Sequence, residues 1–325
     1  MNRPRVGFLG TGWIGRHRMA AMIATGAIEA ASVCDPSPEC VGEALAVAPA
    51  ARVADDFETM LAQDLDAVVI ATPSALHAAQ SIRALEAGLA VFCQKPLGRD
   101  AAEARAVIAA ARAADRLLGV DLSYRHTAAM QAIRPLIRDG ALGEIFAVDL
   151  TFHNAYGPGK PWFFDRRQSG GGCVVDLGVH LVDLALWALA FPEVDDVSAA
   201  LFAKGRPLGP DGVEDYASAR FRAGGADVRL ACSWNLNAGQ DAVISAHFYG
   251  TEGGAGFRNV GGSFYDFTAQ HFIGTQAREL ATFPDPWGAR SAAVWAQALA
   301  AEPHFDPAAE DFARSAEVLD RIYGR

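Results

Sequence analysis

Residues 5–15 read RVGFLGTGWIG, and this stretch decides the fold of the first part of the chain. A short apolar run, RVGFL, leads directly into the pattern G-x-G-x-x-G, and a helix-like segment follows over residues 16–25. A strand that turns through glycines into a helix is typical of the β-α-β unit that holds a dinucleotide. A tight turn without a ligand has the same pattern, so the neighbouring segments have to distinguish the two.

From this stretch to about residue 122, strand-like and helix-like segments alternate. The strand-like runs are AIEAASVCD, DAVVIATPS, GLAVFCQKP and LLGVDLSY, and the helix-like segments between them include ECVGEALAVA, ALHAAQSIRALEAG and EARAVIAAARAADR. This alternation predicts a doubly wound parallel α/β sheet with right-handed crossovers, which is a Rossmann fold. We assign residues 1–122 to a nucleotide-binding domain of this type.

Residues 123–325 show a different pattern. A helix-like segment and an alternating strand-like run, GEIFAVDLTFHN, precede a glycine-rich loop and one apolar helix-like segment. Several strand-like runs follow with turn residues between them, and two helix-like segments near residues 288–300 and 307–323 close the chain. Many strands with few helices predict an α+β domain with an open, mainly antiparallel sheet. We assign this part of the chain to substrate binding and oligomerisation.

The composition argues against several classes of function. A formal net charge of −10 gives no support for the basic surface that a nucleic-acid-binding protein needs. The five cysteines include no C-x-x-C pair, which argues against a disulfide framework and a zinc site. The first strand-like run begins at Arg5, which leaves no room for a signal peptide, and no uninterrupted apolar stretch approaches the length of a membrane span. We expect a cytoplasmic protein without a metal site, a nucleic-acid partner or a membrane contact.

The glycine-rich turn and the end of the second strand-like run predict the cofactor site. The glycines let the backbone approach a pyrophosphate, whose charge is met by the start of the helix. Asp35 lies somewhat past the usual spacing of about 20 residues, and its carboxylate can accept hydrogen bonds from both ribose hydroxyls. It would repel a 2′-phosphate, so the sequence favours NAD over NADP. The expected contacts in the turn are Gly10, Thr11, Gly12, Trp13 and Ile14.

Lys95 ends an apolar run and stands directly before Pro96. Ligands of an open parallel sheet bind outside the carboxyl ends of its strands, so we expect Lys95 to face the cofactor crevice. The alternative is a solvated surface side chain, which is where most lysines lie. Pro96 restricts Lys95 to extended geometry, and the sequence leaves open whether the bond between them is cis.

Residues 170–183, GGGCVVDLGVHLVD, form the second candidate segment. Asp176 and His180 are four residues apart, which places them on one face of a helix, and Asp183 lies on a similar face. Because their neighbours are apolar, these groups are either paired in a structural network or functional. A zinc site would lack a third ligand at suitable spacing. The glycines allow another group to approach the start of this helix closely.

Together these blocks resemble the Gfo/Idh/MocA oxidoreductases, the family of glucose–fructose oxidoreductase and inositol 2-dehydrogenase. The resemblance covers nearly the whole chain. Besides the glycine-rich turn and residues 170–183, it runs through TPSALH at 72–77, QKPL at 94–97 and LGEI at 142–145. It implies that Lys95, Asp176 and His180 form the catalytic set.

The resemblance also places a second group of residues beside the cofactor. It implies that Thr72, Pro73 and His77 line the crevice. The family usually has glutamate before the Lys-Pro pair, whereas this chain has Gln94. A neutral amide can still hydrogen-bond to the cofactor, but it supplies no negative charge beside Lys95.

The expected activity is NAD-dependent transfer of a hydride between nicotinamide C4 and a hydroxyl carbon of a sugar, sugar acid or cyclitol. His180 is the preferred general base, because the ordinary pKa of histidine lies near working pH. Lys95 would hold the same oxygen and stabilise its negative charge, although the two roles can be exchanged. Asp176 would orient His180 or bind a neighbouring hydroxyl.

Further side chains are candidates for the substrate cleft. Trp162 offers an apolar face on which a sugar ring can stack, and Arg166 or Arg167 can grip a carboxylate or a phosphate. The alternative for this segment is a surface loop with core aromatics. The other candidates are Tyr124, Arg125 and His153.

Two other functions remain open at this point. One is a redox-silent sensor that binds a dinucleotide and regulates partners, and the other is a reductase of an imine or an enone. The resemblance implies subunits that pair through the open face of the second sheet, so we expect a homodimer or a homotetramer.

Overall fold

The computed structural model describes residues 3–325, and their contacts divide the chain into two compact units. Unit 1 extends to Asp121 and also includes Ala289–Ala313, and unit 2 comprises Leu122–Gly288 and Arg314–Arg325. The division drawn from the sequence left residues 289–313 in the second domain. They join unit 1 because Trp295 and Leu299 are buried in the same core as the first sheet.

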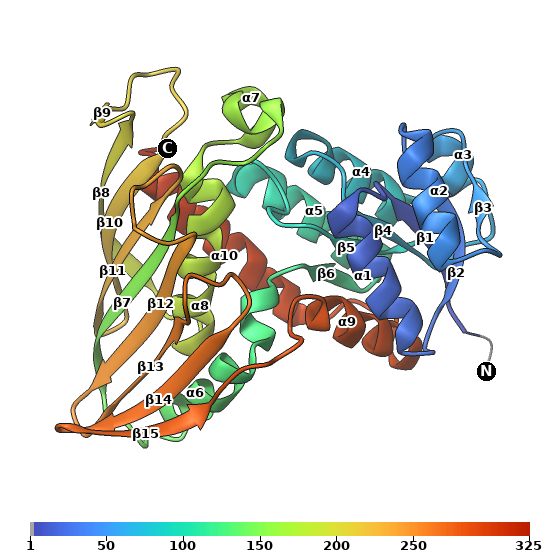
Figure 1. Cartoon of the computed structure of the whole chain (residues 1–325). Helices are drawn as coiled ribbons and strands as arrows, with labels where there is room; N and C mark the ends of the chain where they lie inside the picture. The colour runs from blue at the N-terminus through green and yellow to red at the C-terminus, as the bar shows by residue number, and fades with distance from the viewer. Residues whose placement is uncertain (1–2) are drawn as a thin grey trace. The chain divides into compact units, whose positions relative to one another are not determined.

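Unit 1 is built from alternating strands and helices (Figure 1). In chain order these are β1 (Arg5–Leu9), α1 (Trp13–Ala24), β2 (Glu29–Cys34), α2 (Pro38–Val47), β3 (Arg52–Val53), α3 (Phe57–Leu61), β4 (Ala67–Ile70), α4 (Ser74–Glu86), β5 (Ala90–Cys93), α5 (Ala101–Ala114), β6 (Leu118–Val120), α9 (Arg290–Ala301) and η4 (Pro307–Glu310). The sheet has the order β3-β2-β1-β4-β5-β6, and its strands run parallel. The predicted doubly wound parallel sheet is therefore confirmed.

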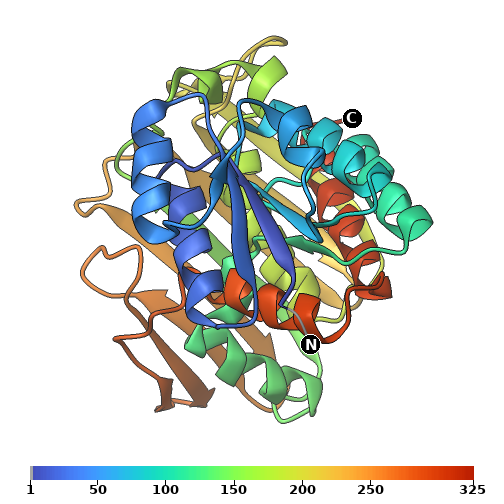
Figure 2. The same ribbon diagram turned by 90° about the vertical axis from the view of Figure 1, so that its right-hand side faces the viewer.

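Helices cover both faces of this sheet, with α1 beside α9 on one face and α4 beside α5 on the other (Figure 2). The strands are buried apolar runs for this reason, as AVVI in β4 and AVFC in β5 show. The register aligns Leu9 with Ile70 and Ile70 with Cys93. The carboxyl ends of β1, β4 and β5 therefore lie side by side, and the loops that leave them meet at one edge of the sheet.

Unit 2 is an α+β unit with a larger sheet (Figure 1). Its elements are η1 (Ser123–His126), α6 (Ala128–Arg138), β7 (Ile145–Asn154), η2 (Pro161–Phe164), α7 (Arg166–Ser169), η3 (Val174–Gly178), α8 (Val179–Ala188), β8 (Val194–Ala203), β9 (Arg206–Pro207), β10 (Tyr216–Ala223), β11 (Ala226–Ser233), β12 (Ala242–Gly250), β13 (Gly254–Asn259), β14 (Phe267–Ile273), β15 (Gln276–Ala281) and α10 (Asp311–Ile322), which belongs to unit 2 from Arg314 on. The strand order is β15-β14-β13-β12-β7-β11-β10-β8-β9.

This second sheet is mainly antiparallel, and the pair of β7 and β11 runs parallel. Helices α6 and α8 pack against one face of it. Burial alternates along β10 and β12, so that one side of each strand is buried and the other is exposed or half-buried. The predicted open, mainly antiparallel sheet is confirmed.

The helical segment 166–188 is long and apolar enough to cross a membrane by length and composition, which the sequence analysis did not anticipate. In its most apolar window, 89% of the residues are buried inside the protein. A core helix has this character, because its apolar surface is covered by neighbouring elements.

Candidate active site

The glycine-rich turn after β1 has a separate physical reason for each glycine. Gly10 has φ +83°, and a Cβ at Gly15 would lie 2.0 Å from the carbonyl oxygen of Gly10. These two positions therefore need glycine for the turn and for close packing of helix on strand. In contrast, a Cβ at Gly12 would meet no atom of the described chain within 4 Å. Gly12 leaves space in front of α1, which fits the approach of a phosphate.

The start of α1 also suits an anion. Gly12 is the N-cap residue, and within the described chain the first turn has neither a capping side chain nor an acidic residue. Its backbone N–H groups and the helix dipole therefore favour negative charge at this end. Thr11 is buried, and its Oγ1 has no hydrogen-bond partner among residues 3–325. These features fit the pyrophosphate of a dinucleotide.

The Asp35 carboxylate is held in place by two backbone groups. The N–H of Thr11 donates to Oδ2 at 2.7 Å, and the N–H of Ser37 donates to Oδ1 at 2.9 Å. An ionised carboxylate accepts about four hydrogen bonds, so it retains capacity for ribose hydroxyls. Its charge stands next to the glycine-rich turn, where it would oppose a 2′-phosphate.

His77 joins two of the loops at this edge of the sheet. Its Nδ1 lies 2.7 Å from the carbonyl oxygen of Pro96, and its Nε2 lies 2.7 Å from that of Thr72. Burial lowers the pKa of His77 and favours the neutral ring, which donates through one nitrogen only. Both partners are carbonyl oxygens, so the neutral ring of His77 lies between the loop after β4 and the loop after β5 and donates to one of them. Thr72 uses its hydroxyl to donate to Gln80 at 2.6 Å, and Pro73 precedes α4.

Lys95 leaves the carboxyl end of β5, and the peptide bond between Lys95 and Pro96 is cis. The side chain of the preceding Gln94 is buried, and its Nε2 donates to Oδ2 of Asp121 at 2.5 Å. We expected Gln94 to contact the cofactor, whereas its amide points into a buried cluster. Asp121 was not among the residues expected from the sequence, although it follows β6, the next strand at the same edge of the sheet.

The segment with Asp176 and His180 is not one regular α-helix. Residues 174–178 form a π-helical turn, η3, which continues into α8. Residues four apart lie on a similar side of a π turn and of an α-helix, so the shared face of Asp176 and His180 stays a prediction. Turns of the π type are rare and are frequent at functional sites. Asp176 is half-buried, and its Oδ2 accepts a hydrogen bond from Nε1 of Trp234 at 3.1 Å.

His180 is 8% exposed and packs among aromatic rings. The ring of Tyr124 lies 4.8 Å from the imidazole centroid, and the ring of Phe152 lies 6.4 Å from it. Tyr124 is itself buried and also packs on Trp287, at 4.8 Å between ring centroids. Burial raises the pKa of Tyr124, so its hydroxyl stays neutral. The neutral ring of Tyr124 therefore packs directly against the imidazole of His180.

Two polar residues approach the glycines before η3 closely. The sequence predicted that some group would do so at this point. A Cβ at Gly171 would lie 2.0 Å from Oη of Tyr323, and one at Gly172 would lie 2.0 Å from the carbonyl oxygen of Glu214. Oε1 of Glu214 accepts from the N–H groups of Gly172 at 2.9 Å and Val174 at 3.0 Å, and from the Tyr323 hydroxyl at 2.7 Å. This carboxylate thus caps the segment that carries Asp176.

Arg125 and His153 have structural partners in unit 2. Arg125 makes two hydrogen bonds to Asp183, one of them from Nε at 2.7 Å. Nδ1 of His153 lies 2.8 Å from the hydroxyl of Ser233, and its ring stacks on Tyr216 at 6.0 Å. The ion pair holds η1 to α8, and His153 lies on the sheet face opposite α8.

The aromatic segment around η2 packs on the residue that contacts Asp176. Trp162 stacks on Phe163 with 3.8 Å between centroids, and Phe163 and Phe164 meet Trp234 edge to face. Arg166 donates to the carbonyl oxygen of Pro210 at 2.8 Å. Arg167 follows it and is exposed. Trp234 was not predicted as a site residue, because the sequence shows it only as an aromatic residue that follows a strand.

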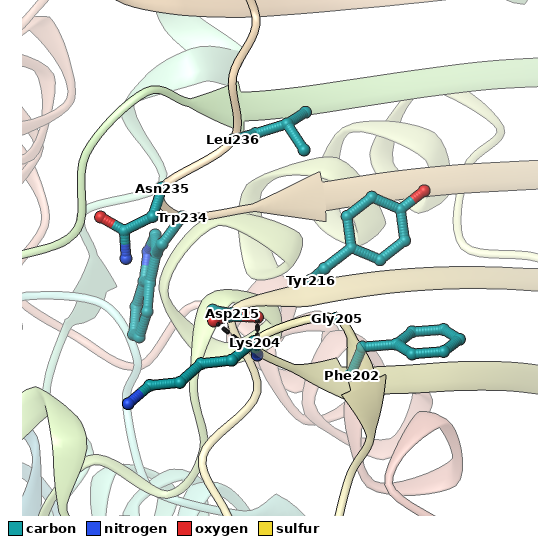
Figure 3. Close-up of a pocket in the computed structure, with 8 residues that line it drawn as sticks. All are labelled: Phe202, Lys204, Gly205, Asp215, Tyr216, Trp234, Asn235 and Leu236. Atoms are coloured by element: carbon teal, nitrogen blue, oxygen red, sulfur yellow. Dashed lines mark hydrogen bonds between the residues drawn. The ribbon is translucent and has the colours of Figure 1, made fainter.

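Trp234 also lines a pocket of about 410 Å³ that lies wholly in unit 2 (Figure 3). The Asp215 carboxylate accepts from the N–H of Lys204 at 2.9 Å and 3.1 Å, and its carbonyl oxygen accepts from the N–H of Trp234 at 2.7 Å. Figure 3 shows the indole, the Asn235 amide and the Lys204 ammonium group toward one side of the pocket. The lining residues are Phe202, Lys204, Gly205, Asp215, Tyr216, Trp234, Asn235 and Leu236.

Two family models match most of the chain. Residues 4–122 match an oxidoreductase family with an NAD-binding Rossmann fold, and residues 130–255 match the GFO/IDH/MocA C-terminal domain. The D-glucoside 3-dehydrogenase of Escherichia coli (strain K12) is 31% identical over 270 residues, which are 77% of this chain and 76% of that protein. This chain belongs to the Gfo/Idh/MocA oxidoreductase family. The predicted family is thereby confirmed.

Other relatives agree with this assignment. The inositol 2-dehydrogenase of Rhizobium meliloti (strain 1021) is 30% identical over 256 residues, covering 78% of this chain and 76% of that protein. Levoglucosan dehydrogenase in complex with NADH and levoglucosan has a TM-score of 0.83 at 24% identity, over 99% of this chain and 97% of its own. The 3-ketoreductase KijD10 from Actinomadura kijaniata, in complex with NADP, has a TM-score of 0.84 at 22% identity, over 99% of this chain and 98% of its own. These two likenesses show the shared fold.

Proposed function

We propose that this protein is an NAD-dependent dehydrogenase that oxidises a hydroxyl carbon of a sugar, sugar acid or cyclitol. The observation that carries the proposal is the position of Lys95, two residues after β5, at the sheet edge where the open glycine-rich turn lies. Relatives named D-glucoside 3-dehydrogenase and inositol 2-dehydrogenase support the class of substrate.

The residues at the carboxyl edge of the first sheet fit a nicotinamide dinucleotide. Gly12 and the start of α1 would hold the pyrophosphate, and Asp35 would hold the adenosine ribose. When bound, the dinucleotide supplies the acceptor for the hydride. Neighbours in the same fold bind either NADH or NADP, and the fixed carboxylate of Asp35 supports NAD for this chain.

The protein side chains would manage the proton and the developing charge. Lys95 donates a hydrogen bond to the reacting oxygen and stabilises its negative charge, while the hydroxyl proton moves to the imidazole of His180. Asp176 is fixed by the indole N–H of Trp234 and binds a neighbouring hydroxyl or orients His180. A deprotonated lysine can take the proton in place of the imidazole, with His180 then holding the oxygen.

Two of the arginines in unit 2 that are candidates for the substrate cleft have hydrogen-bond partners within the chain. Arg125 is committed to Asp183 by two hydrogen bonds, and Arg166 donates to a backbone carbonyl. A guanidinium has five N–H donors, so these contacts leave a sugar acid among the proposed substrates. The aromatic segment of Trp162, Phe163 and Phe164 offers the apolar surface on which pyranose or cyclitol rings stack.

The remaining parts of the proposal concern assembly and compartment. The face of the second sheet opposite α6 and α8 would pair two copies of the chain into a homodimer or a homotetramer. Light scattering of the purified protein measures this directly, and a monomer would contradict it. We assign the protein to the cytoplasm.

The test is a scan for NADH formation with glucosides, inositols, anhydrosugars and sugar acids, each with NAD and with NADP. We expect turnover with NAD and at least one of these compounds. Absence of turnover throughout the panel, together with tight NADH binding, would favour a redox-silent sensor. Faster NADH consumption with imines or enones than with any ketosugar would favour a reductase of those substrates.

A further inference from the structure

A buried carboxylate in unit 1 joins the strand end that carries Lys95 to two helices. Asp121 follows β6, is 1% exposed, and donates its backbone N–H to the carbonyl oxygen of Cys93 at 2.9 Å. It therefore lies beside the end of β5. Its side chain is a hydrogen-bond acceptor for groups from three different elements.

Three donors converge on this carboxylate. Nε of Arg18, from α1, lies 2.6 Å from Oδ2, and Nε2 of Gln94 lies 2.5 Å from the same oxygen. The hydroxyl of Ser291, from α9, donates to Oδ1. In turn, Nη1 of Arg18 lies 2.9 Å from Nδ1 of His17. The carboxylate is thus satisfied by one cation and two neutral donors.

The charge balance of this cluster explains why residue 94 is an amide. The side chains of Arg18 and Asp121 are 7% and 0% exposed, so the pair is a buried ion pair with no net charge. A second carboxylate at position 94 would stand within hydrogen-bond distance of the first, with one guanidinium to serve both. Two carboxylates in such a site cannot both ionise, and an unpaired buried charge is strongly unfavourable.

We propose that Asp121 is a positioning residue for Lys95, which rests on the proposed role of Lys95 in catalysis. By fixing Gln94, it fixes the backbone from which the next residue, Lys95, leaves the sheet. The same oxygen fixes Arg18 on α1, the helix whose start faces the dinucleotide site. Residues 94 and 121 therefore work as a pair that requires one carboxylate and one amide, in either order.

A reciprocal exchange tests this inference. The variants are Gln94→Glu, Asp121→Asn and the double variant that carries both changes. We expect each single change to lower kcat about tenfold or more, and the double variant to recover to within about threefold of wild type, because coupled network residues are not additive. The KM for NAD should stay within about twofold throughout.

The control is Gln168→Glu, because the exposed amide of Gln168 donates to Oδ2 of Asp165 at 3.0 Å with the same chemistry. Its kcat should remain that of wild type. The inference is overturned if the double variant is no better than the worse single variant, or if the single changes raise KM for NAD and leave kcat unaltered. Where a single variant does not fold, recovery of a folded and active double variant still supports the inference, and its failure to fold overturns it.

The two proposals fail in different ways. A wild-type protein without turnover on any polyol removes the proposed function and this inference with it. An active wild-type protein whose double variant does not recover removes only the role of Asp121.

Discussion

Replacing Glu214 should destabilise unit 2 strongly, because this side chain accepts three hydrogen bonds in a buried site. Glu214 is 0% exposed, and its Oε1 serves Gly172, Val174 and Tyr323. Glu214→Leu leaves these three donors without an acceptor, at about 1–3 kcal/mol for each buried group. Removing a buried carboxylate offsets part of that cost, so we expect a net loss of about 3–5 kcal/mol.

The matched variant is Glu214→Gln, which keeps an acceptor oxygen for the same donors. Its amide nitrogen would take the place of Oε2, which has no hydrogen-bond partner within the described chain. We expect a smaller loss of about 1–2 kcal/mol. Urea unfolding followed by tryptophan fluorescence measures both variants. A loss below about 1 kcal/mol in the leucine variant would refute the reasoning, as would equal losses in the two variants.

The same side chain makes a prediction about pH. Burial raises the pKa of Glu214 above its ordinary 4.5, so the folded protein holds this proton over a pH range in which the unfolded chain has released it. The contribution to stability is therefore full below that ordinary value and declines as pH rises through the pKa of the folded state. Glu214→Gln should lack this decline, and an unchanged pH profile would contradict the assignment.

Four further substitutions test other parts of the site. Gly12→Ala should leave the free energy of unfolding within about 0.5 kcal/mol and weaken NADH binding about tenfold, whereas Gly15→Ala should destabilise the protein by about 1–3 kcal/mol because its Cβ would lie 2.0 Å from a carbonyl oxygen. Calorimetric titration and urea unfolding distinguish the two. Asp35→Asn should lower the preference for NAD over NADP, measured as the ratio of kcat/KM values, about tenfold. Trp234→Phe removes the N–H that donates to Asp176 and should lower kcat about tenfold at constant KM for NAD. Unchanged turnover in this last variant would exclude a catalytic use of that contact.

The parts of the molecule that follow from local sequence were predictable. A few consecutive residues determine each of three features: the glycine-rich turn, the alternation of strands and helices, and Asp35 directly after β2. They were sufficient to predict the parallel sheet and to place Lys95 at a strand end. The second sheet was predictable as a class, because alternating runs with turn residues have few other outcomes.

The remaining features depend on residues far apart in the chain. Glu214 and Tyr323 meet the glycines at 171 and 172, and a sequence shows only that some close partner is required there. Gln94 could be recognised as unusual, but its reason, Asp121, lies 27 residues away. Likewise, α9 joins unit 1 through Trp295, although it follows the strands of unit 2.

The π-helical turn at residues 174–178 was unpredictable for a different reason. A helical pattern of apolar residues does not reveal whether one turn contains an extra residue, because both forms bury the same side chains. The spacing of four residues between Asp176 and His180 is compatible with both forms, so it could not distinguish them.

The central claim is that Lys95 and His180 act on one substrate oxygen beside the bound coenzyme. It is tested most directly by measuring kcat and the Kd of NADH for Lys95→Ala and His180→Ala with the best substrate of the panel. The account predicts a fall in kcat of about 100-fold or more in each variant, with unchanged NADH affinity. Near-wild-type turnover in either variant would contradict it.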